Sequence, residues 1–278
     1  MINQIIGEKI AIVTHKSQTT RSLIKGIYFK QKTQIVFMDT PGIFKSNRLI
    51  DKIMVKNAWK SLNDSNMVCF LYDASINKIN LNTFEIIKKL NKINTPVILI
   101  LNKIDLIDKK NLLPLISEFQ KLLKFEEIFM LSALKNKGIE KLLDWLIFQM
   151  PVGPYFYPIE DITDTNLRNI ASEILREKLL INMHQEIPYN LLVTTEIWKE
   201  KKNKDLEIHL NIFVSKSSHK AMILGKSGNN IKRIGILARN EMEKVFDKKI
   251  HLYTRVKLQE NCLTNLNLLR SSGLDIDA

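Results

Sequence analysis

Three short groups of polar residues in the first half of the chain could together bind a nucleotide. They are Asp-Thr-Pro-Gly at 39–42, Asn-Lys-Ile-Asp at 102–105 and Ser-Ala-Leu at 132–134. Gly42 lets its backbone N–H approach a γ-phosphate, and Asp39 can hold the shell of a Mg²⁺ ion on the phosphates. The two carboxylate oxygens of Asp105 match the N1–H and amine donors of guanine, a pair that adenine lacks. The groups predict a site for GTP.

Each group alone has an ordinary explanation, because a Pro-containing turn or a solvated loop needs no ligand. Their order, and the apolar run that precedes each of them, make chance agreement of all three improbable. We expect Asn102 and Lys103 to brace the base and its loop, and backbone N–H groups near Ser132 and Ala133 to meet guanine O6. The candidate set is Asp39, Thr40, Pro41, Gly42, Ile43, Asn102, Lys103, Ile104, Asp105, Ser132, Ala133 and Leu134.

The elements that must position these groups alternate between strands and helices. Near-continuous apolar runs predict buried strands at 33–40, 66–73, 96–105 and 126–133. Helical spacing of apolar residues occurs at 47–63, 82–94, 109–124 and 138–149. Repeated strand–helix units predict a doubly wound α/β domain. Such a domain binds its ligand at the carboxyl ends of its strands, where the three groups fall.

A proline-rich segment divides the chain. Residues 150–164 contain three of the seven prolines. Because proline fixes φ and interrupts both helix and sheet, this segment is expected to be a semi-rigid connector. We therefore predict a nucleotide domain at 1–149, a linker at 150–164 and a second domain at 165–278 that ends in a tail.

The second domain is predicted to follow the order helix, strand, strand, helix, helix, strand. Its two central helices are separated by Gly-Lys-Ser-Gly at 225–228, with more basic residues directly after the turn. A GxxG turn alone could simply connect two helices. With positive charge and a helix N-terminus beside it, the turn predicts a type II KH domain, which clamps about four nucleotides of single-stranded RNA. The candidate RNA-binding residues are Gly225, Lys226, Ser227, Gly228, Lys232 and Arg233.

Charge and cysteine content agree with this prediction. The formal net charge is +13, and from Lys216 to Lys257 eleven Lys or Arg residues accompany only three acids. Such a basic region favours a polyanion as partner. Cys69 and Cys262 are far apart in the sequence, so a disulfide framework is not expected and the reducing cytoplasm is the predicted compartment.

Taken together, these motifs resemble the bacterial Era GTPases. The resemblance runs from about residue 2 to the end of the chain and includes the linker, Ala-Ser-Glu-Ile-Leu-Arg-Glu-Lys-Leu at 171–179 and the KH core at 223–239. The segment at 16–21 looks like the switch I segment of that family. By this resemblance the switch I residues are Gln18, Thr19, Thr20, Arg21 and Ser22.

The resemblance implies a protein that binds GTP or GDP with Mg²⁺ and hydrolyses GTP to GDP and phosphate. It implies binding to the 3′ end of 16S ribosomal RNA and a role in assembly of the small (30S) ribosomal subunit, by a cytoplasmic monomer. Peripheral association with the inner membrane is a further trait suggested for the family. Thr19 or Thr20 would join Asp39 at the Mg²⁺ ion, and the sequence leaves open which. Ile43 stands where Ras-like enzymes place a water-orienting Gln, so no catalytic residue is assigned.

One expected motif has no match in the sequence. The phosphate loop, G-x-x-x-x-G-K-[ST], does not occur, and the resemblance places it just before Met1 together with a first strand. We expect an upstream extension in frame to supply both, and a nucleotide half without them to fold poorly and not to hold GTP. The alternative hypothesis is an RNA-binding ribosome-assembly factor whose nucleotide domain no longer binds GTP.

Overall fold

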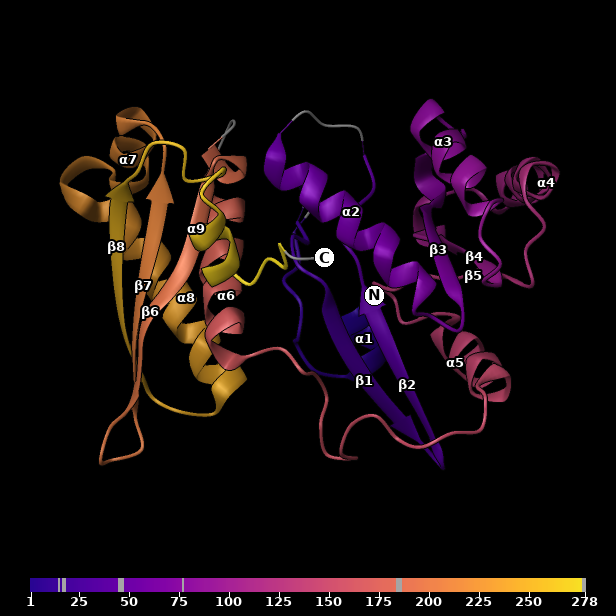
Figure 1. Cartoon of the computed structure of the whole chain (residues 1–278), viewed down its shortest axis with the longest axis horizontal. Helices are drawn as coiled ribbons and strands as arrows, with labels where there is room; N and C mark the ends of the chain where they lie inside the picture. Colours follow the sequence, from indigo (N-terminus) through magenta and orange to yellow (C-terminus); the bar gives the residue numbers. More distant parts are fainter. Residues whose placement is uncertain (15, 17–18, 45–47, 77, 184–186, 277–278) are drawn as a thin grey trace.

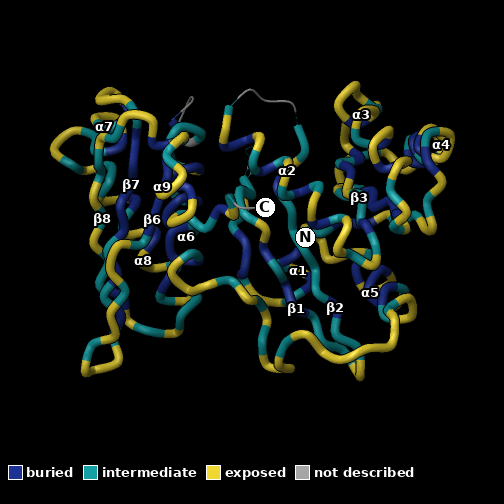
Figure 2. The backbone as a smooth tube through the Cα atoms, viewed as in Figure 1, coloured by how far each residue is buried: buried dark blue, intermediate teal, exposed yellow. Residues whose placement is uncertain are grey.

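The structure, a computed structural model, describes residues 1–14, 16, 19–44, 48–76, 78–183 and 187–276. It consists of two halves that lie side by side, and the segment 150–166 passes from one to the other (Figure 1). Buried residues concentrate inside each half and also between them (Figure 2). No helix among the described residues is both long and apolar enough to cross a membrane.

The first half contains two groups of strands. An antiparallel pair is formed by β1 (Ile24–Lys30) and β2 (Thr33–Asp39). A parallel sheet in the order β3-β4-β5 is formed by β3 (Val68–Asp73), β4 (Val97–Asn102) and β5 (Ile128–Met130). The central strand β4 is buried along its apolar residues, as a parallel strand covered on both faces requires.

Helices cover both faces of the parallel sheet. The bounds are α1 (Ile2–Ile6), α2 (Leu49–Asn63), α3 (Leu81–Leu90), α4 (Leu112–Leu122) and α5 (Ile139–Gln149). On one face, Phe119 of α4 and Ile87 of α3 pack in the same cluster as Leu99. On the other face, Leu142 of α5 packs with Ile100. The predicted doubly wound arrangement is confirmed.

The sheet of the first half is divided between β2 and β3. These two strands do not pair with each other, so the antiparallel pair and the parallel sheet are separate. Side chains join them instead, because Ile35 of β2 belongs to the buried cluster that contains Ile98 and Ile100 of β4.

The second half is built as predicted. Its helices are α6 (Leu167–Asn182), α7 (Ser217–Leu224) and α8 (Asn229–Phe246), and its strands are β6 (Leu191–Glu200), β7 (Leu206–Val214) and β8 (Ile250–Leu258). The strand order is β6-β7-β8, with β6–β7 antiparallel and β7–β8 parallel. Alternate residues of β7 are fully buried under the helices, among them Ile208, Leu210 and Ile212.

The linker runs along the antiparallel pair of the first half (Figure 1). Ile27 of β1 donates its N–H to the carbonyl of Ile162 at 2.8 Å, and Thr163 donates its hydroxyl to the carbonyl of Lys25 at 2.7 Å. Lys25 also forms an ion pair of 2.9 Å with Asp164. These bonds fix the connector on β1. The connector is therefore more ordered than its proline content alone would predict.

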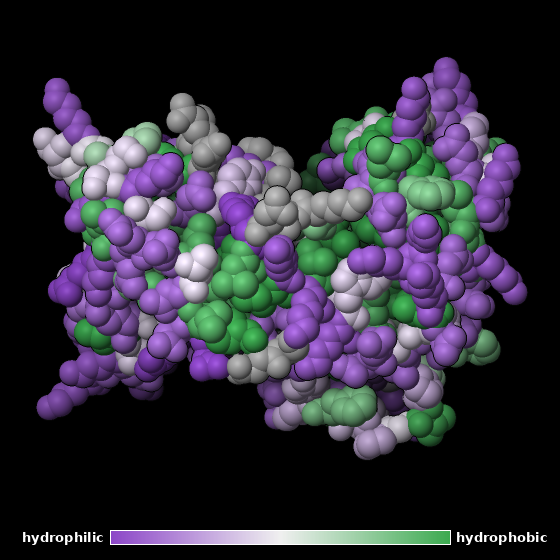
Figure 3. All heavy atoms as spheres, turned by 45° about the horizontal axis from the view of Figure 1, so that its top comes forward, coloured by the Kyte–Doolittle hydropathy of each residue, from purple (hydrophilic) through white to green (hydrophobic). Residues whose placement is uncertain are grey.

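The C-terminal segment connects the second half to α2. A short helix, α9 (Leu266–Ser271), contributes Leu269 to a buried cluster that also holds Met54 of α2 and Phe213 of β7. Asn57 of α2 donates its side-chain amide to the carbonyl of Asp275 at 2.6 Å. In Figure 3 hydrophilic residues cover most of the visible face, while apolar residues also gather near its middle.

Candidate nucleotide and RNA sites

The residues predicted to read guanine lie together at the ends of β4 and β5. The side-chain oxygen of Asn102 accepts hydrogen bonds from the N–H of Lys103 at 2.8 Å and from the N–H of Ala133 at 3.0 Å. Asp105 accepts a hydrogen bond from the hydroxyl of Ser132, and this bond lowers the pKa of the carboxyl group. The exposed carboxylate is therefore ionised at neutral pH and already oriented.

Two of the backbone N–H groups expected near guanine O6 already donate hydrogen bonds within the protein. Ser132 donates its N–H to the carbonyl of Lys137 at 3.0 Å, and Ala133 donates to Asn102, so both groups serve the fold. The N–H of Leu134 makes no hydrogen bond within the described part of the chain, and its side chain is 81 % exposed. The N–H of Leu134 is therefore an open donor in this turn.

Asp73 is a member of this group that sequence reasoning missed. It ends β3, opposite Asn102 in the register, and its carboxylate lies 2.6 Å from the Nζ of Lys103. Burial opposes ionisation of Asp73, but hydrogen bonds from Lys103 and Ser75 outweigh it and lower the pKa. The signal in the sequence was a polar residue that ends the apolar run 66–73, at the same sheet edge as Asn102.

The turn predicted to face the γ-phosphate follows β2. Burial raises the pKa of Asp39 to about 6, although the ammonium group of Met1 acts in the opposite direction. The Asp39 side chain accepts no hydrogen bond from the described residues, and the space beside Gly42 is open. Within the described part of the chain no hydrogen bond or ion pair joins this turn to the guanine-reading group.

The predicted switch I segment lies against the second half. Gln18 is outside the described residues. The hydroxyl of Thr19 lies 2.8 Å from the hydroxyl of Thr14 and donates to the carbonyl of Lys16 at 2.6 Å, whereas the hydroxyl of Thr20 makes no hydrogen bond within the described chain. Arg21 donates to the carbonyls of Leu191 at 2.7 Å and Tyr189 at 3.2 Å. Ser22 lines a pocket beside α6.

The GxxG turn has a geometry that its first glycine makes possible. At Gly225 φ is +71°, and an added Cβ would lie 2.6 Å from the Cβ of Asn230. Ser227 also has a positive φ, of 53°, and Gly228 has a φ of +76° with open space beside it. The amide of Asn230 donates to the carbonyl of Met222 at 3.1 Å, which ties the start of α8 to the end of α7.

Three exposed basic side chains lie at this turn or directly after it. Lys226, Lys232 and Arg233 are exposed, and none of them forms an ion pair within the described part of the chain. The turn leads directly into the N-terminus of α8, an eighteen-residue helix, where backbone N–H groups and the helix dipole favour an anion. The arrangement can hold successive phosphates of a nucleic-acid strand.

Comparison with known proteins identifies a family for each half. Residues 1–103 match the family model described as "50S ribosome-binding GTPase", and residues 186–263 match the one described as "KH domain". The chain is 40 % identical over 275 residues to GTPase Era of Sinorhizobium medicae (strain WSM419), which covers 99 % of this chain and 88 % of that protein. GTPase Era of Brucella suis biovar 1 (strain 1330) is 38 % identical over the same length. The chain belongs to the Era family of GTPases.

Solved Era structures have the same fold throughout. A point variant of Era from Aquifex aeolicus, bound to GDP·AlF4⁻, superposes with a TM-score of 0.94 at 31 % identity, covering 99 % of this chain and 94 % of that one. Era in complex with MgGDPNP and nucleotides 1506–1542 of 16S ribosomal RNA gives the same TM-score and covers 93 % of that chain. The Era fold, a GTPase domain followed by a KH domain, is therefore the fold of this protein.

Proposed function

We propose that this Era family member binds and hydrolyses GTP and binds the 3′ end of 16S ribosomal RNA through its KH half, and that it assists assembly of the small ribosomal subunit in the cytoplasm. The observation that carries the proposal is the preformed group at the ends of β4 and β5. In it Asn102 holds the turn that contains Ala133 while Asp105 remains exposed. The GxxG turn in the same chain supplies the second binding site.

In this proposal guanine is recognised by one carboxylate and one amide. Asp105 accepts from N1–H and the exocyclic amine, and the N–H of Leu134 donates to O6. The Nζ of Lys103 is held by the carboxylate of Asp73 at 2.6 Å, which fixes this side chain at the edge of the sheet. These contacts favour GTP over ATP, because adenine offers no pair of donors at the matching positions.

The residues of the first half also fit a Mg²⁺ ion. Asp39 is a partly buried carboxylate whose raised pKa reflects burial, and a cation would favour its ionised form. Of the two candidate threonines we assign Thr20 to the ion, because the Thr19 hydroxyl is used by Lys16 and Thr14. When bound, Mg²⁺ would neutralise charge on the phosphates, while the N–H of Gly42 approaches the γ-phosphate.

The KH half would hold the RNA backbone at the GxxG turn. Gly228 leaves room for a phosphate, and Lys226 places beside it an exposed ammonium that pairs with no acid of the described chain. Lys232 and Arg233, in the first turns of α8, extend the positive surface. Support for 16S ribosomal RNA as the partner comes from the solved Era complex that contains nucleotides 1506–1542 of this RNA.

Binding measurements on the full chain test both parts of the proposal. RNA of the 16S 3′ end should bind with a log–log salt slope of about −2 if roughly three phosphates are neutralised. The double variant Lys226→Asp with Ser227→Asp should abolish this binding. A control of identical charge change, Ser117→Asp with Lys121→Asp on the exposed face of α4, should not.

The nucleotide part is tested with fluorescent GDP and GTP and with phosphate release. Binding and hydrolysis of GTP by the full chain would support the proposal, and would contradict the expectation that a nucleotide half without the phosphate loop does not hold GTP. RNA binding without any nucleotide binding would instead favour an RNA-binding assembly factor. Unchanged RNA affinity in the Lys226→Asp, Ser227→Asp double variant would contradict the assignment of the GxxG turn.

A further inference from the structure

Helix α6 buries an arginine at the boundary between the two halves. The side chain of Arg176 is only 2 % exposed. Glu173, one turn earlier, accepts from its Nε at 2.7 Å and from its Nη2 at 2.6 Å. A buried ion pair of this kind contributes little stability compared with apolar side chains of the same volume. We therefore expect a role of the Arg176–Glu173 pair other than stabilising α6.

Arg176 also reaches the other half of the molecule. Its Nη2 donates to the backbone carbonyl of Thr19, 157 residues away in the sequence, whereas its Nη1 has no hydrogen-bond partner among the described residues. The hydrogen bond falls on the peptide group between Thr19 and Thr20. Arg176 therefore holds the predicted switch I segment at the peptide group that joins its two threonines.

Arg21 makes the matching connection in the opposite direction. It extends from the switch I segment to the carbonyls of Tyr189 and Leu191 in the second half. Burial, together with the positive charge of Arg176, lowers the pKa of Arg21 to about 9. The two guanidinium groups repel each other electrostatically. This repulsion is offset because each guanidinium donates hydrogen bonds to backbone carbonyls of the opposite half.

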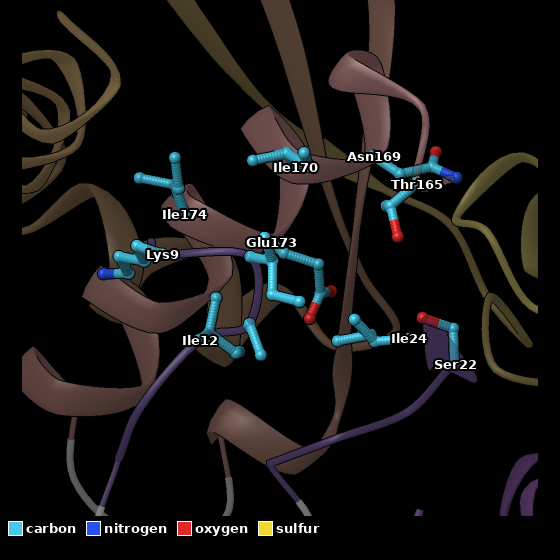
Figure 4. Close-up of a pocket in the computed structure, with 11 residues that line it drawn as sticks. Lys9, Ile12, Ser22, Ile24, Thr165, Asn169, Ile170, Glu173 and Ile174 are labelled. Carbon is cyan, nitrogen blue, oxygen red and sulfur yellow. The ribbon is translucent and has the colours of Figure 1, made fainter. Parts of the chain in front are cut away.

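Neighbouring contacts support the same docking. Lys16 donates its Nζ to the carbonyl of Met183 at 2.5 Å, and Glu177 accepts from the N–H of Val13 at 2.8 Å. In Figure 4 Glu173 projects from α6 into the pocket that Ile12 and Ile24 line from the first half. Val13, Lys16 and Thr19 thus all contact α6 or the residue that follows it.

We propose that Arg176 is a positioning residue for switch I. Held by Glu173, it fixes the Thr19–Thr20 peptide from the RNA-binding half, so that Thr20 is placed for Mg²⁺ only while the two halves are docked. This inference rests on the proposed function, because the role of Thr20 belongs to it. Arg176 touches neither the nucleotide nor the ion; it acts through the backbone of switch I.

The test compares Arg176→Met with Lys9→Met in the full chain. Both variants remove a cation from the same interface, but Lys9 pairs with Glu177 and Glu241 and does not contact Thr19. Amide hydrogen exchange of the 19–22 segment without nucleotide should become about tenfold to a hundredfold faster in Arg176→Met, since one hydrogen bond from a charged donor is lost. It should be unchanged in Lys9→Met.

A second readout separates positioning from general stability. In Arg176→Met the Mg²⁺ concentration that half-activates GTP hydrolysis should rise about tenfold, while GDP affinity and RNA affinity stay within about twofold. Arg176→Lys, which keeps the charge but not the forked donor, should recover part of the exchange protection. If Arg176→Met does not fold, Arg176→Lys decides the matter by the same measurements.

Unchanged exchange at 19–22, or an equal increase in Lys9→Met, would overturn the proposal. Unchanged Mg²⁺ dependence despite faster exchange would overturn the part that concerns hydrolysis. If the unmodified chain neither binds nor hydrolyses GTP, the proposed function fails. The exchange measurement then still decides whether Arg176 holds the segment.

Discussion

In the proposed function a single carboxylate, that of Asp105, selects the base at the nucleotide site. Asp105 is exposed, receives a hydrogen bond from Ser132, and lies beside a turn that Asn102 holds in place. Two acceptor oxygens in fixed positions pair with a base that has two adjacent donors. In this assignment the preference for guanine depends on Asp105 alone, whereas the orientation of the Asp105 side chain depends on its neighbours.

Replacing Asp105 by Asn should therefore change the base preference from guanine to xanthine. The amide supplies a donor for the C2 oxygen of xanthine and loses one acceptor for the guanine amine, so GDP affinity should fall about tenfold to a hundredfold. Competition of fluorescent GDP by GDP and by XDP measures the change. Asp108→Asn, at a neighbouring exposed carboxylate that pairs with Lys110, is the control. Retained GDP preference in Asp105→Asn would contradict the assignment.

The two glycines of the RNA-binding turn should respond differently to alanine. Both have positive φ, but only Gly228, with ψ of 8°, lies in the left-handed helical region, where alanine costs roughly 1–2 kcal/mol. Gly225, with ψ of 179°, lies in a region that is essentially restricted to glycine, which adds to the cost of alanine there. In Gly225→Ala the new methyl group would also lie 2.6 Å from the Cβ of Asn230 and would displace the first turn of α8, whereas Gly228→Ala meets open space. RNA affinity and urea unfolding should both show the larger loss for Gly225→Ala. Equal losses would mean that Asn230 is not a constraint.

At the scale of elements, α6 is unusual because it carries charge on the side that faces the first half. Arg176 and Glu177 are each 2 % exposed. Glu177 accepts from Lys9 at 2.7 Å, and Lys9 and Lys178 also pair with Glu241 of α8 at 2.5 Å and 2.9 Å. This network joins two helices of the second half to the segment that precedes switch I.

The contribution of this network to stability should disappear in acid. Burial opposes the ionisation of Glu241, but hydrogen bonds from Lys9 and Lys178 outweigh it and lower the pKa below the ordinary 4.5. A carboxyl group with a lowered pKa stabilises the folded state above its unfolded-state pKa, and this stabilisation is lost as pH falls through the folded-state pKa. The difference in unfolding free energy between wild type and Glu241→Gln should therefore shrink below about pH 4.5. Glu260→Gln, at an exposed carboxylate, should show no such trend.

Elements with a strong local signal could be predicted from the sequence, and others could not. The run Val97–Leu101 is apolar on both faces, and the structure confirms it as the central strand β4. Strand β1 was missed because Gly26 interrupts a short, half-buried strand that has no clean alternation. Helix α9 has only six residues, so periodicity cannot reveal it.

The proximity of Asn102 and Ala133 could be predicted because these residues follow successive strands. Parallel strands bring their carboxyl ends to one edge, so Asn102 and Ala133 had to meet. The contacts of Arg176 and Arg21 could not be predicted in this way. They join residues 157 to 170 positions apart. The acceptors are backbone carbonyls, which every residue has, so the residue type at the accepting position gives no signal in the sequence.

At the scale of the whole molecule, three sets of contacts between described residues join the two halves. Arg176 and Arg21 hold the predicted switch I segment, the network of Lys9 holds the preceding segment, and the cluster of Met54, Leu269 and Cys262 joins α2 to the C-terminal segment. An interface with both a buried apolar cluster and buried ion pairs resembles a domain core more than a transient contact. The halves should therefore move and unfold together.

We predict that the full chain unfolds in a single transition. Ile100→Ala in the first half and Leu210→Ala in the second half each remove a fully buried side chain and should lower the free energy of unfolding by about 2–5 kcal/mol. If the halves are coupled, both variants shift the same calorimetric transition, whereas Leu81→Ala, at a side chain that is 87 % exposed, leaves it unchanged. Adding Met54→Ala, which opens the cluster between α2 and the C-terminal segment, should divide the transition into two, because the apolar part of the interface is lost while both cores remain. Two transitions already present in the unmodified chain, with Ile100→Ala and Leu210→Ala each shifting only one of them, would show that the halves are independent.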